Sequence, residues 1–136
     1  MAASVLADAS FLVALLSERD RNHRWAIAEA TKHSTPWNTC EAALSEAFFL
    51  LGTRGAPVLS ELMRRGALTC AFNLAEEFEA VLTFMDKYAD VPMSLADGCL
   101  VRMTETFPNA VLLTTDSDFR IYRRHSRQAV PCVLPR

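Results

Sequence analysis

Four acidic residues that lie far apart in the sequence could together perform metal-dependent chemistry. Asp8 and Asp116 each follow a short apolar segment with the character of a buried strand, whereas Glu46 and Asp97 lie in segments of helical character. Carboxylates that converge repel one another, and a divalent cation would compensate their charge. All-oxygen ligands favour hard ions such as Mg²⁺ or Mn²⁺. The four acids therefore predict a Mg²⁺ or Mn²⁺ site.

The neighbours of Glu46 and Asp97 support this prediction. Residues three and four positions apart share a helix face, and all four such neighbours of Glu46 are apolar. Asp97 is followed at the same spacings by Leu100 and Val101. We therefore expect both carboxylates on or beside faces that pack inward. Glu41 competes with Glu46 for this place, but its forward neighbours include a serine, so Glu46 is preferred.

Each acid also has a structural explanation. Asp8 could cap a helix after the first strand, and Asp116 could belong to a capping cluster with Asp118. Ser94 and Asp97 approximate a capping box in which Asp replaces the usual Glu. Glu46 could pair with an arginine. These separate explanations account less well for all four acids lying at one edge of a sheet, the arrangement that the predicted fold gives them.

Strand-like and helix-like segments alternate along the chain. Strands or extended segments are predicted over residues 4–7, 34–37, 67–72, 110–115 and 129–134. Helices are predicted over residues 11–18, 22–32, 40–52, 57–66, 74–88 and 94–107, with a short helix from about residue 117. Ser10 and Ser94 are the expected N-caps of the first and last long helices. Pro131 places the last strand at a sheet edge.

This alternation predicts a three-layer α/β/α fold with a central, mostly parallel sheet. The length of 136 residues suits a single domain over residues 1–136. Ligands on such sheets bind beyond the carboxyl ends of the strands. Asp8 and Asp116 both lie at such ends, so we expect them on one rim.

Composition excludes several other classes of protein. Apolar residues make up 51% of the chain and charged residues 22%, which excludes a disordered chain. The net charge of −2 gives no overall nucleic-acid signature, although residues 101–136 carry a net charge of +3. The apolar run "FLVALL" is too short to span a bilayer, so no membrane partner is expected. Four cysteines without C-x-x-C spacing favour a reducing, cytoplasmic location over a zinc site or secreted scaffold.

The order of the acidic motifs resembles that of a known family. The segment "DAS" ends the first strand, "LSEAFFLL" contains Glu46, "MSLADGCLV" contains Asp97, and "TTDSDF" contains Asp116. In this order they resemble the PIN domain family of metal-dependent ribonucleases. In size the chain is similar to the single-domain toxins of VapBC-type toxin–antitoxin pairs. The resemblance covers nearly the whole chain.

The resemblance implies an acidic cluster that binds Mg²⁺ or Mn²⁺ and hydrolyses RNA. It assigns catalytic roles to four acids, namely Asp8, Glu46, Asp97 and Asp116. Three of them are implied metal ligands, namely Asp8, Asp97 and Asp116. Ser10 and Thr114 resemble polar supports beside the cluster, and Asp118 resembles a more variable fifth acid. Asp90 lies before the Asp97 helix and is assigned to the outer rim.

Substrate contact is expected from positive charge outside the acids. Arg120, Arg123 and Arg124 follow Asp118 closely and could bind RNA phosphates. A solvated helix end, with arginines favoured by the helix dipole, explains them equally well. The family resemblance also implies a homodimer and a small antitoxin that covers the acidic site.

Two rival interpretations belong to different classes of function. A phospho-acceptor or small-ligand domain on a flavodoxin-like sheet would also place Asp8 at a strand end. It requires a lysine near a later strand end, and Lys32 and Lys87 are poorly placed for this role. A catalytically weak PIN-like interaction module is the other rival, and the retained acids argue against it.

Overall fold

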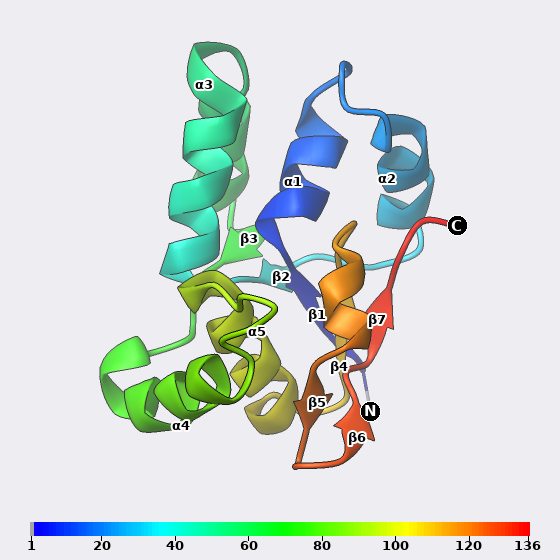
Figure 1. The fold of residues 1–136 in the computed structure, drawn as a ribbon. Coiled ribbons are helices and arrows are strands. Elements are labelled where there is room, and N and C mark those ends of the chain that lie inside the picture. Colours follow the sequence, from blue (N-terminus) through cyan, green and yellow to red (C-terminus); the bar gives the residue numbers. More distant parts are fainter. Residues whose placement is uncertain (1) are drawn as a thin grey trace.

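Five short strands form one parallel sheet at the centre of the computed structural model, which describes residues 2–136 (Figure 1). The strands lie in the order β3-β2-β1-β4-β7, and each neighbouring pair is parallel. Their bounds are β1 Ser4–Ala7, β2 Trp37–Asn38, β3 Leu68–Thr69, β4 Ala110–Leu113 and β7 Cys132–Val133. The predicted α/β class with a parallel sheet is therefore confirmed.

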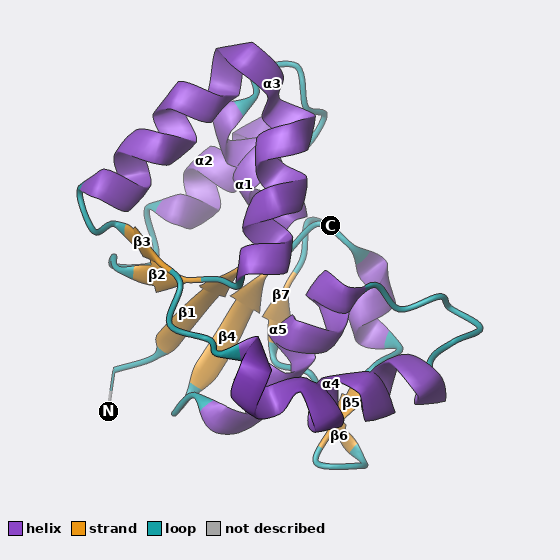
Figure 2. Ribbon diagram, turned by 90° about the vertical axis from the view of Figure 1, so that its left-hand side faces the viewer, coloured by secondary structure: helices purple, strands orange, loops and turns teal. Residues whose placement is uncertain are grey.

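Helices cover both faces of this sheet. Their bounds are α1 Ala9–Leu16, α2 His23–Ala30, α3 Glu41–Arg64, α4 Leu74–Lys87 and α5 Leu95–Thr106, with the short 3-10 helix η1 at Ser117–Arg120. The chain moves outward from β1 to β3 and then returns to β4 on the other side of β1. Right-handed crossovers then require the helices before this return, α1–α3, and those within it, α4 and α5, to cover opposite faces. Figure 2 shows α1–α3 on one side of the sheet and α4 and α5 on the other.

The reversal of strand order places a topological switch point between β1 and β4. The two strands are paired along their whole length, from Ser4 opposite Ala110 to Ala7 opposite Leu113. Val5 and Leu6 on β1, and Leu112 on β4, are buried, as expected for a strand covered on both faces. The crevice beyond the carboxyl ends of two such strands is where open α/β sheets bind ligands.

Two predicted helices form one interrupted helix. α3 runs from residue 41 to residue 64, but Gly52 inside it has φ 61° and ψ −157°. This conformation is almost restricted to glycine, and it kinks the helix where the sequence predicts a stop. The helix ends before Gly66, whose φ is 73°. The helix end predicted at residue 52 is therefore a kink in the structure rather than a stop.

The boundaries of other elements differ from the prediction. α1 begins at Ala9, so Asp8 rather than Ser10 occupies its N-cap, and Ser94 is the N-cap of α5 as predicted. The strand expected over residues 67–72 is only Leu68–Thr69, because its partner β2 is equally short.

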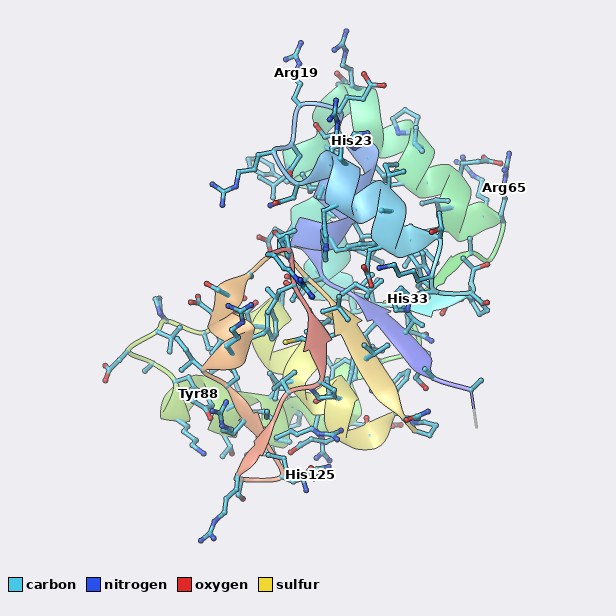
Figure 3. All side chains as sticks on the ribbon, turned by 90° about the vertical axis from the view of Figure 1, so that its right-hand side faces the viewer. Arg19, His23, His33, Arg65, Tyr88 and His125 are labelled. Atoms are coloured by element: carbon cyan, nitrogen blue, oxygen red, sulfur yellow. The ribbon has the colours of Figure 1, made fainter. Side chains whose placement is uncertain are left out.

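The C-terminal segment contains a hairpin that the sequence analysis did not predict. β5 Arg123–Arg124 pairs antiparallel with β6 Gln128–Ala129, and β7 follows after Pro131 at the sheet edge. Arg123 N–H donates to Tyr88 Oη at 2.9 Å, and His125 N–H donates to Glu105 Oε2 at 2.7 Å (Figure 3). Contacts with α4 and α5, rather than strand propensity, therefore hold this hairpin.

One cluster of buried apolar side chains joins the layers. Phe11 on α1, Leu112 on β4 and Leu100 on α5 are fully buried members of it. Among residues 2–136, none of the helices is both long and apolar enough to cross a membrane.

Candidate acidic site at the end of the sheet

The pairing of β1 with β4 brings Asp8 to the loop after β4. Asp8 N–H donates to Leu113 O at 3.0 Å, which continues the ladder one residue beyond β1. Thr114 is the first residue after the neighbouring strand β4, and Asp116 lies two residues further along the chain. The structure therefore brings the first and last predicted acids together across more than a hundred residues of sequence.

Two hydroxyl groups hold the buried carboxylate of Asp8. Thr114 Oγ1 donates to Asp8 Oδ2 at 2.7 Å, and Ser10 Oγ donates to the same oxygen at 2.8 Å. Each hydroxyl accepts in turn from a backbone N–H, that of Asp116 for Thr114 and that of Thr115 for Ser10, both at 3.0 Å. A hydroxyl has one proton, so both protons point to Asp8. The loop after β4 is thereby tied to Asp8.

Asp8 does not act as a helix cap through its side chain. It occupies the N-cap position of α1, but its carboxylate makes no cap hydrogen bond there. Burial raises the pKa of Asp8 from 3.8 to about 6, although the bonds from Thr114 and Ser10 oppose this rise. The charges of Asp97 and Asp116 raise the pKa further. The site therefore favours a proton or another positive charge at Asp8.

Asp97 enters the site from α5, on the opposite side of the sheet from α1. Ser94 Oγ accepts from Asp97 N–H at 3.0 Å, which is the first half of the predicted capping box. The carboxylate of Asp97 accepts from the buried Tyr122 Oη at 2.8 Å. Burial raises the pKa of Asp97, and the charges of Asp116 and Glu46 add to the rise. Asp97 is therefore more than a capping residue.

Tyr122 is a site residue that sequence reasoning missed. It is fully buried, and its ring packs edge-on against Tyr88 and Phe119, with ring centroids 5.1 and 5.3 Å away. Burial and the bond to Asp97 raise the pKa of its phenol, so it remains a donor. The contact spans 25 positions and joins different elements, so no local pattern could indicate it.

Asp116 combines a structural role with its place in the cluster. Its Oδ1 accepts from Asp118 N–H at 2.9 Å, which caps η1 as the structural explanation proposed. Among residues 2–136, no hydrogen bond reaches the second carboxylate oxygen of Asp116. Asp118 is half-buried, and burial and the charge of Asp116 raise its pKa.

The two glutamates of α3 differ from the expectation of an inward face. Glu46 is exposed, although its charge acts on Asp97. Its apolar neighbour Phe49 is 84% exposed, because this face of α3 lies uncovered. Glu41 is also exposed, and its charge acts on Cys70 rather than on the aspartates. Asp90 is exposed in the loop before α5.

The donor set suits a hard divalent cation, but the acids do not form a closed cage. Within residues 2–136, no group of three or more His, Cys, Asp or Glu side chains is arranged to hold a metal ion. The donors that do converge are carboxylate oxygens, which is the chemistry Mg²⁺ and Mn²⁺ select. Mg²⁺ usually keeps several waters and uses only one or two protein carboxylates. The aspartates therefore supply the type of donor that such ions bind, without forming a complete metal site in the described residues.

The three arginines expected to bind RNA have different surroundings. Arg123 Nη1 donates to the carbonyls of Arg120, Ile121 and Tyr122 at 2.7, 3.4 and 2.9 Å. Arg124 Nη1 donates to Thr104 O at 2.6 Å. These bonds give both side chains a structural role in the hairpin. Arg120 is exposed, and no hydrogen bond or ion pair within the described part of the chain engages its guanidinium.

The fold and the site define a class: a three-layer α/β protein with an aspartate cluster at the switch point of its sheet. No protein-family model matches the chain. No curated protein matches it either. The function is therefore argued from the site.

Proposed function

We propose that this chain is a Mg²⁺- or Mn²⁺-dependent endoribonuclease of the PIN domain type. One observation carries the proposal: Asp8, Asp97 and Asp116 come from separate elements, yet the charges of Asp97 and Asp116 raise the pKa of Asp8, and the charge of Asp116 raises the pKa of Asp97. This is an unfavourable arrangement that a bound cation would relieve. The position at the strand-order reversal, where such sheets bind ligands, supports it further.

Asp8, Asp97 and Asp116 would hold the ion, directly or through water. When bound, the ion polarises the phosphodiester and lowers the pKa of a water ligand. Ser10 and Thr114 both donate to Oδ2 of Asp8, so its Oδ1 would be available as a ligand. Tyr122 orients Asp97, and the exposed Glu46 beside Asp97 can accept a proton from the attacking water. The expected products carry 5′-phosphate and 3′-hydroxyl ends.

The biological setting is part of the proposal. We propose a toxin of a toxin–antitoxin pair that acts on RNA in the cytoplasm, and four free cysteines support a reducing compartment. The exposed side chains of Phe49 on α3 and Phe78 on α4 support protein–protein contacts. A homodimer and a cognate antitoxin are the proposed partners.

A catalytically weak interaction module is the second candidate. The open arrangement of the acids and the exposure of Glu46 favour it over the small-ligand domain. The flavodoxin-like alternative lacks a suitable lysine, because Lys32 pairs with Glu29 at 3.2 Å and Lys87 lies over the Tyr88 ring.

Cleavage of labelled single-stranded RNA separates these candidates. We expect the purified chain to cut RNA with Mn²⁺ and to stop when EDTA is in excess. Asp97→Asn is expected to slow cleavage by roughly 100-fold or more, because a lost metal ligand removes several kcal/mol of transition-state stabilisation. Asp90→Asn is the matched control, since Asp90 is exposed outside the cluster. Equal cleavage in EDTA, or full activity of Asp97→Asn, would show that the proposal is wrong.

Tyr122→Phe is expected to weaken Mn²⁺ binding by about 10- to 100-fold, the usual effect of losing a residue that orients a metal ligand. The variant loses only the bond to Asp97 and keeps the buried ring. Isothermal titration with Mn²⁺ measures the affinity. Tyr88→Phe is the control, because Tyr88 Oη contacts the backbone of Arg123 rather than an acid. Identical Mn²⁺ affinities of Tyr122→Phe and the wild type would contradict the assigned role.

A further inference from the structure

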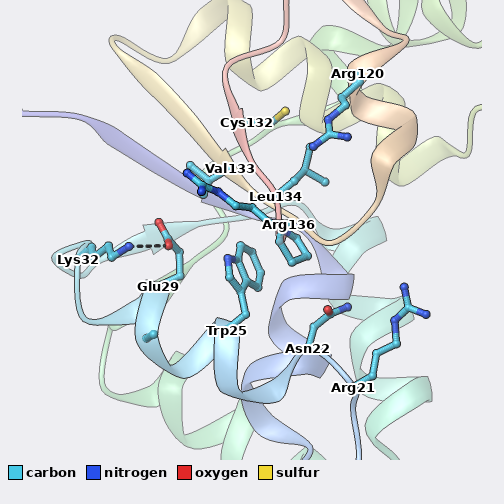
Figure 4. Close-up of a pocket in the computed structure, with 12 residues that line it drawn as sticks. Arg21, Asn22, Trp25, Glu29, Lys32, Arg120, Cys132, Val133, Leu134 and Arg136 are labelled. Atoms are coloured by element: carbon cyan, nitrogen blue, oxygen red, sulfur yellow. Dashed lines mark hydrogen bonds and ion pairs between the residues drawn. The ribbon is translucent and has the colours of Figure 1, made fainter.

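A hollow lies on the side of the molecule where α2 faces the C-terminal segment (Figure 4). Its volume is about 940 Å³, and it is lined by α2 and the two residues before it, by Arg120 of η1, and by β7 and the chain that follows it. Thr114 N–H donates to Val133 O at 3.2 Å. Val133 belongs to the wall of the hollow, and Thr114 also donates to the carboxylate of Asp8. The hollow therefore adjoins the acidic site through β7.

The hollow is positively charged. Four cationic side chains line it, namely Arg21, Lys32, Arg120 and Arg136. Glu29, the acidic residue that lines it, is buried. Its carboxylate already contacts Lys32 Nζ at 3.2 Å and His33 Nε2 at 3.0 Å. The bond from His33, more than any other contact, lowers the pKa of Glu29, so this carboxylate is ionised and neutralised internally.

The remaining three cations form no ion pair within the described residues. Within residues 2–136, no ion pair or side-chain hydrogen bond engages Arg21, Arg120 or Arg136, and all three are exposed. Unpaired arginines that converge on one concave surface repel one another and attract an extended anion. Such an anion would bridge the walls of the hollow.

Trp25 adds an aromatic surface between these cations. Its indole lines the hollow and is half-buried, with its ring edge-on to Phe11 at a centroid distance of 5.8 Å (Figure 4). Cationic side chains around an aromatic ring are typical of surfaces that bind single-stranded nucleic acid, where bases stack and phosphates pair with arginine. An acidic peptide would use the charges but not the ring.

We infer that this hollow binds a single-stranded RNA segment next to the scissile phosphate, with Arg21 and Arg136 on phosphates and Trp25 against a base. The inference rests on the proposed ribonuclease function. It also meets an electrostatic need, because a cluster of carboxylates repels RNA and requires nearby positive charge to retain it.

Binding of a short fluorescein-labelled oligouridine in EDTA tests the inference without cleavage. The double variant Arg21→Gln/Arg136→Gln is expected to raise the Kd about 10-fold or more, measured by fluorescence anisotropy. The slope of log K against log salt is expected to fall by about 1.4, because two phosphate contacts on a single strand are lost. The charge control is Arg65→Gln/Arg127→Gln, which removes the same charge away from the hollow; Arg65 lies at the end of α3 and pairs with the exposed Glu61 at 3.2 Å (Figure 3).

Trp25 supplies an independent readout. Trp37 is only 6% exposed, so quenching of tryptophan emission by oligouridine should report Trp25 and should disappear in Trp25→Phe. Equal losses of affinity in the two double variants would overturn the inference. Displacement of the RNA by polyglutamate of equal charge at equal concentration would also overturn it, because the ring would then contribute nothing.

The same measurements distinguish failure of the inference from failure of the proposed function. If Mn²⁺ supports no cleavage but binding depends on Arg21 and Arg136, the hollow binds RNA and the nuclease proposal fails. If cleavage is normal and binding is unchanged in the double variant, the nuclease proposal stands and the inference fails.

Discussion

Asp8→Asn is expected to slow Mn²⁺-dependent RNA cleavage by roughly 1,000-fold while making the protein more stable. The amide oxygen of the introduced asparagine could still accept from the Ser10 and Thr114 hydroxyls, so the loop after β4 should keep its place. The lost charge removes a proposed metal ligand, and about 4 kcal/mol of lost transition-state stabilisation corresponds to this rate effect. Cleavage of labelled RNA with Mn²⁺ measures the loss.

The gain in stability has a separate cause. In the metal-free wild type, the buried Asp8 must ionise at neutral pH although its pKa is raised from 3.8 to about 6. A rise of this size corresponds to a loss of stability on the order of 3 kcal/mol, which the neutral asparagine avoids. Urea unfolding in EDTA measures this gain, with Asp90→Asn as control. A variant that is both less stable and fully active would contradict the assigned role of Asp8.

The pH dependence of stability is the second large effect. Between about pH 4 and about pH 6 the folded protein retains a proton on Asp8 that the unfolded chain has released. The folded state binds more protons in this window, so the free energy of unfolding of the wild type relative to Asp8→Asn falls as pH rises. We expect this difference in the free energy of unfolding to fall by on the order of 3 kcal/mol. The fall should be complete about one pH unit above the pKa of Asp8 in the folded protein.

Comparison with Asp8→Asn removes the contributions of groups that do not interact with Asp8. Glu29, whose pKa is lowered mainly by His33, contributes stability above its unfolded pKa that is lost as pH falls, which is the opposite direction. Its contribution cancels when the two proteins are compared at each pH. With saturating Mn²⁺ the relative trend is expected to reverse, because the ion binds the ionised site. A pH-independent difference in EDTA would show that Asp8 is not held protonated in this window.

Local sequence patterns were sufficient for the fold and for the aspartates. Alternating strand and helix signals predicted the parallel sheet, and parallel strands place residues that follow them at the same edge. Asp8 and Asp116 could therefore be assigned to one rim without knowledge of strand order. Gly52 and Ser94 were recognisable because helix breaks and caps depend on only a few neighbouring residues.

Predictions that required knowledge of packing failed. The apolar neighbours of Glu46 indicated a buried face, but a pattern cannot show which apolar faces the fold covers, and Phe49 is exposed. Tyr122 reaches Asp97 from another element. Arg123 and Arg124 form a strand through contacts with α4 and α5, which no local propensity favours.

The pairing of β1 with β4 also determines when the acids can meet during synthesis. A ribosome releases Ser4 more than a hundred residues before its partner Ala110, and Tyr122, which secures Asp97, emerges later still. A nascent or prematurely terminated chain therefore carries its carboxylates unassembled. Any activity that depends on their meeting is therefore withheld until the segment through Tyr122 has left the ribosome.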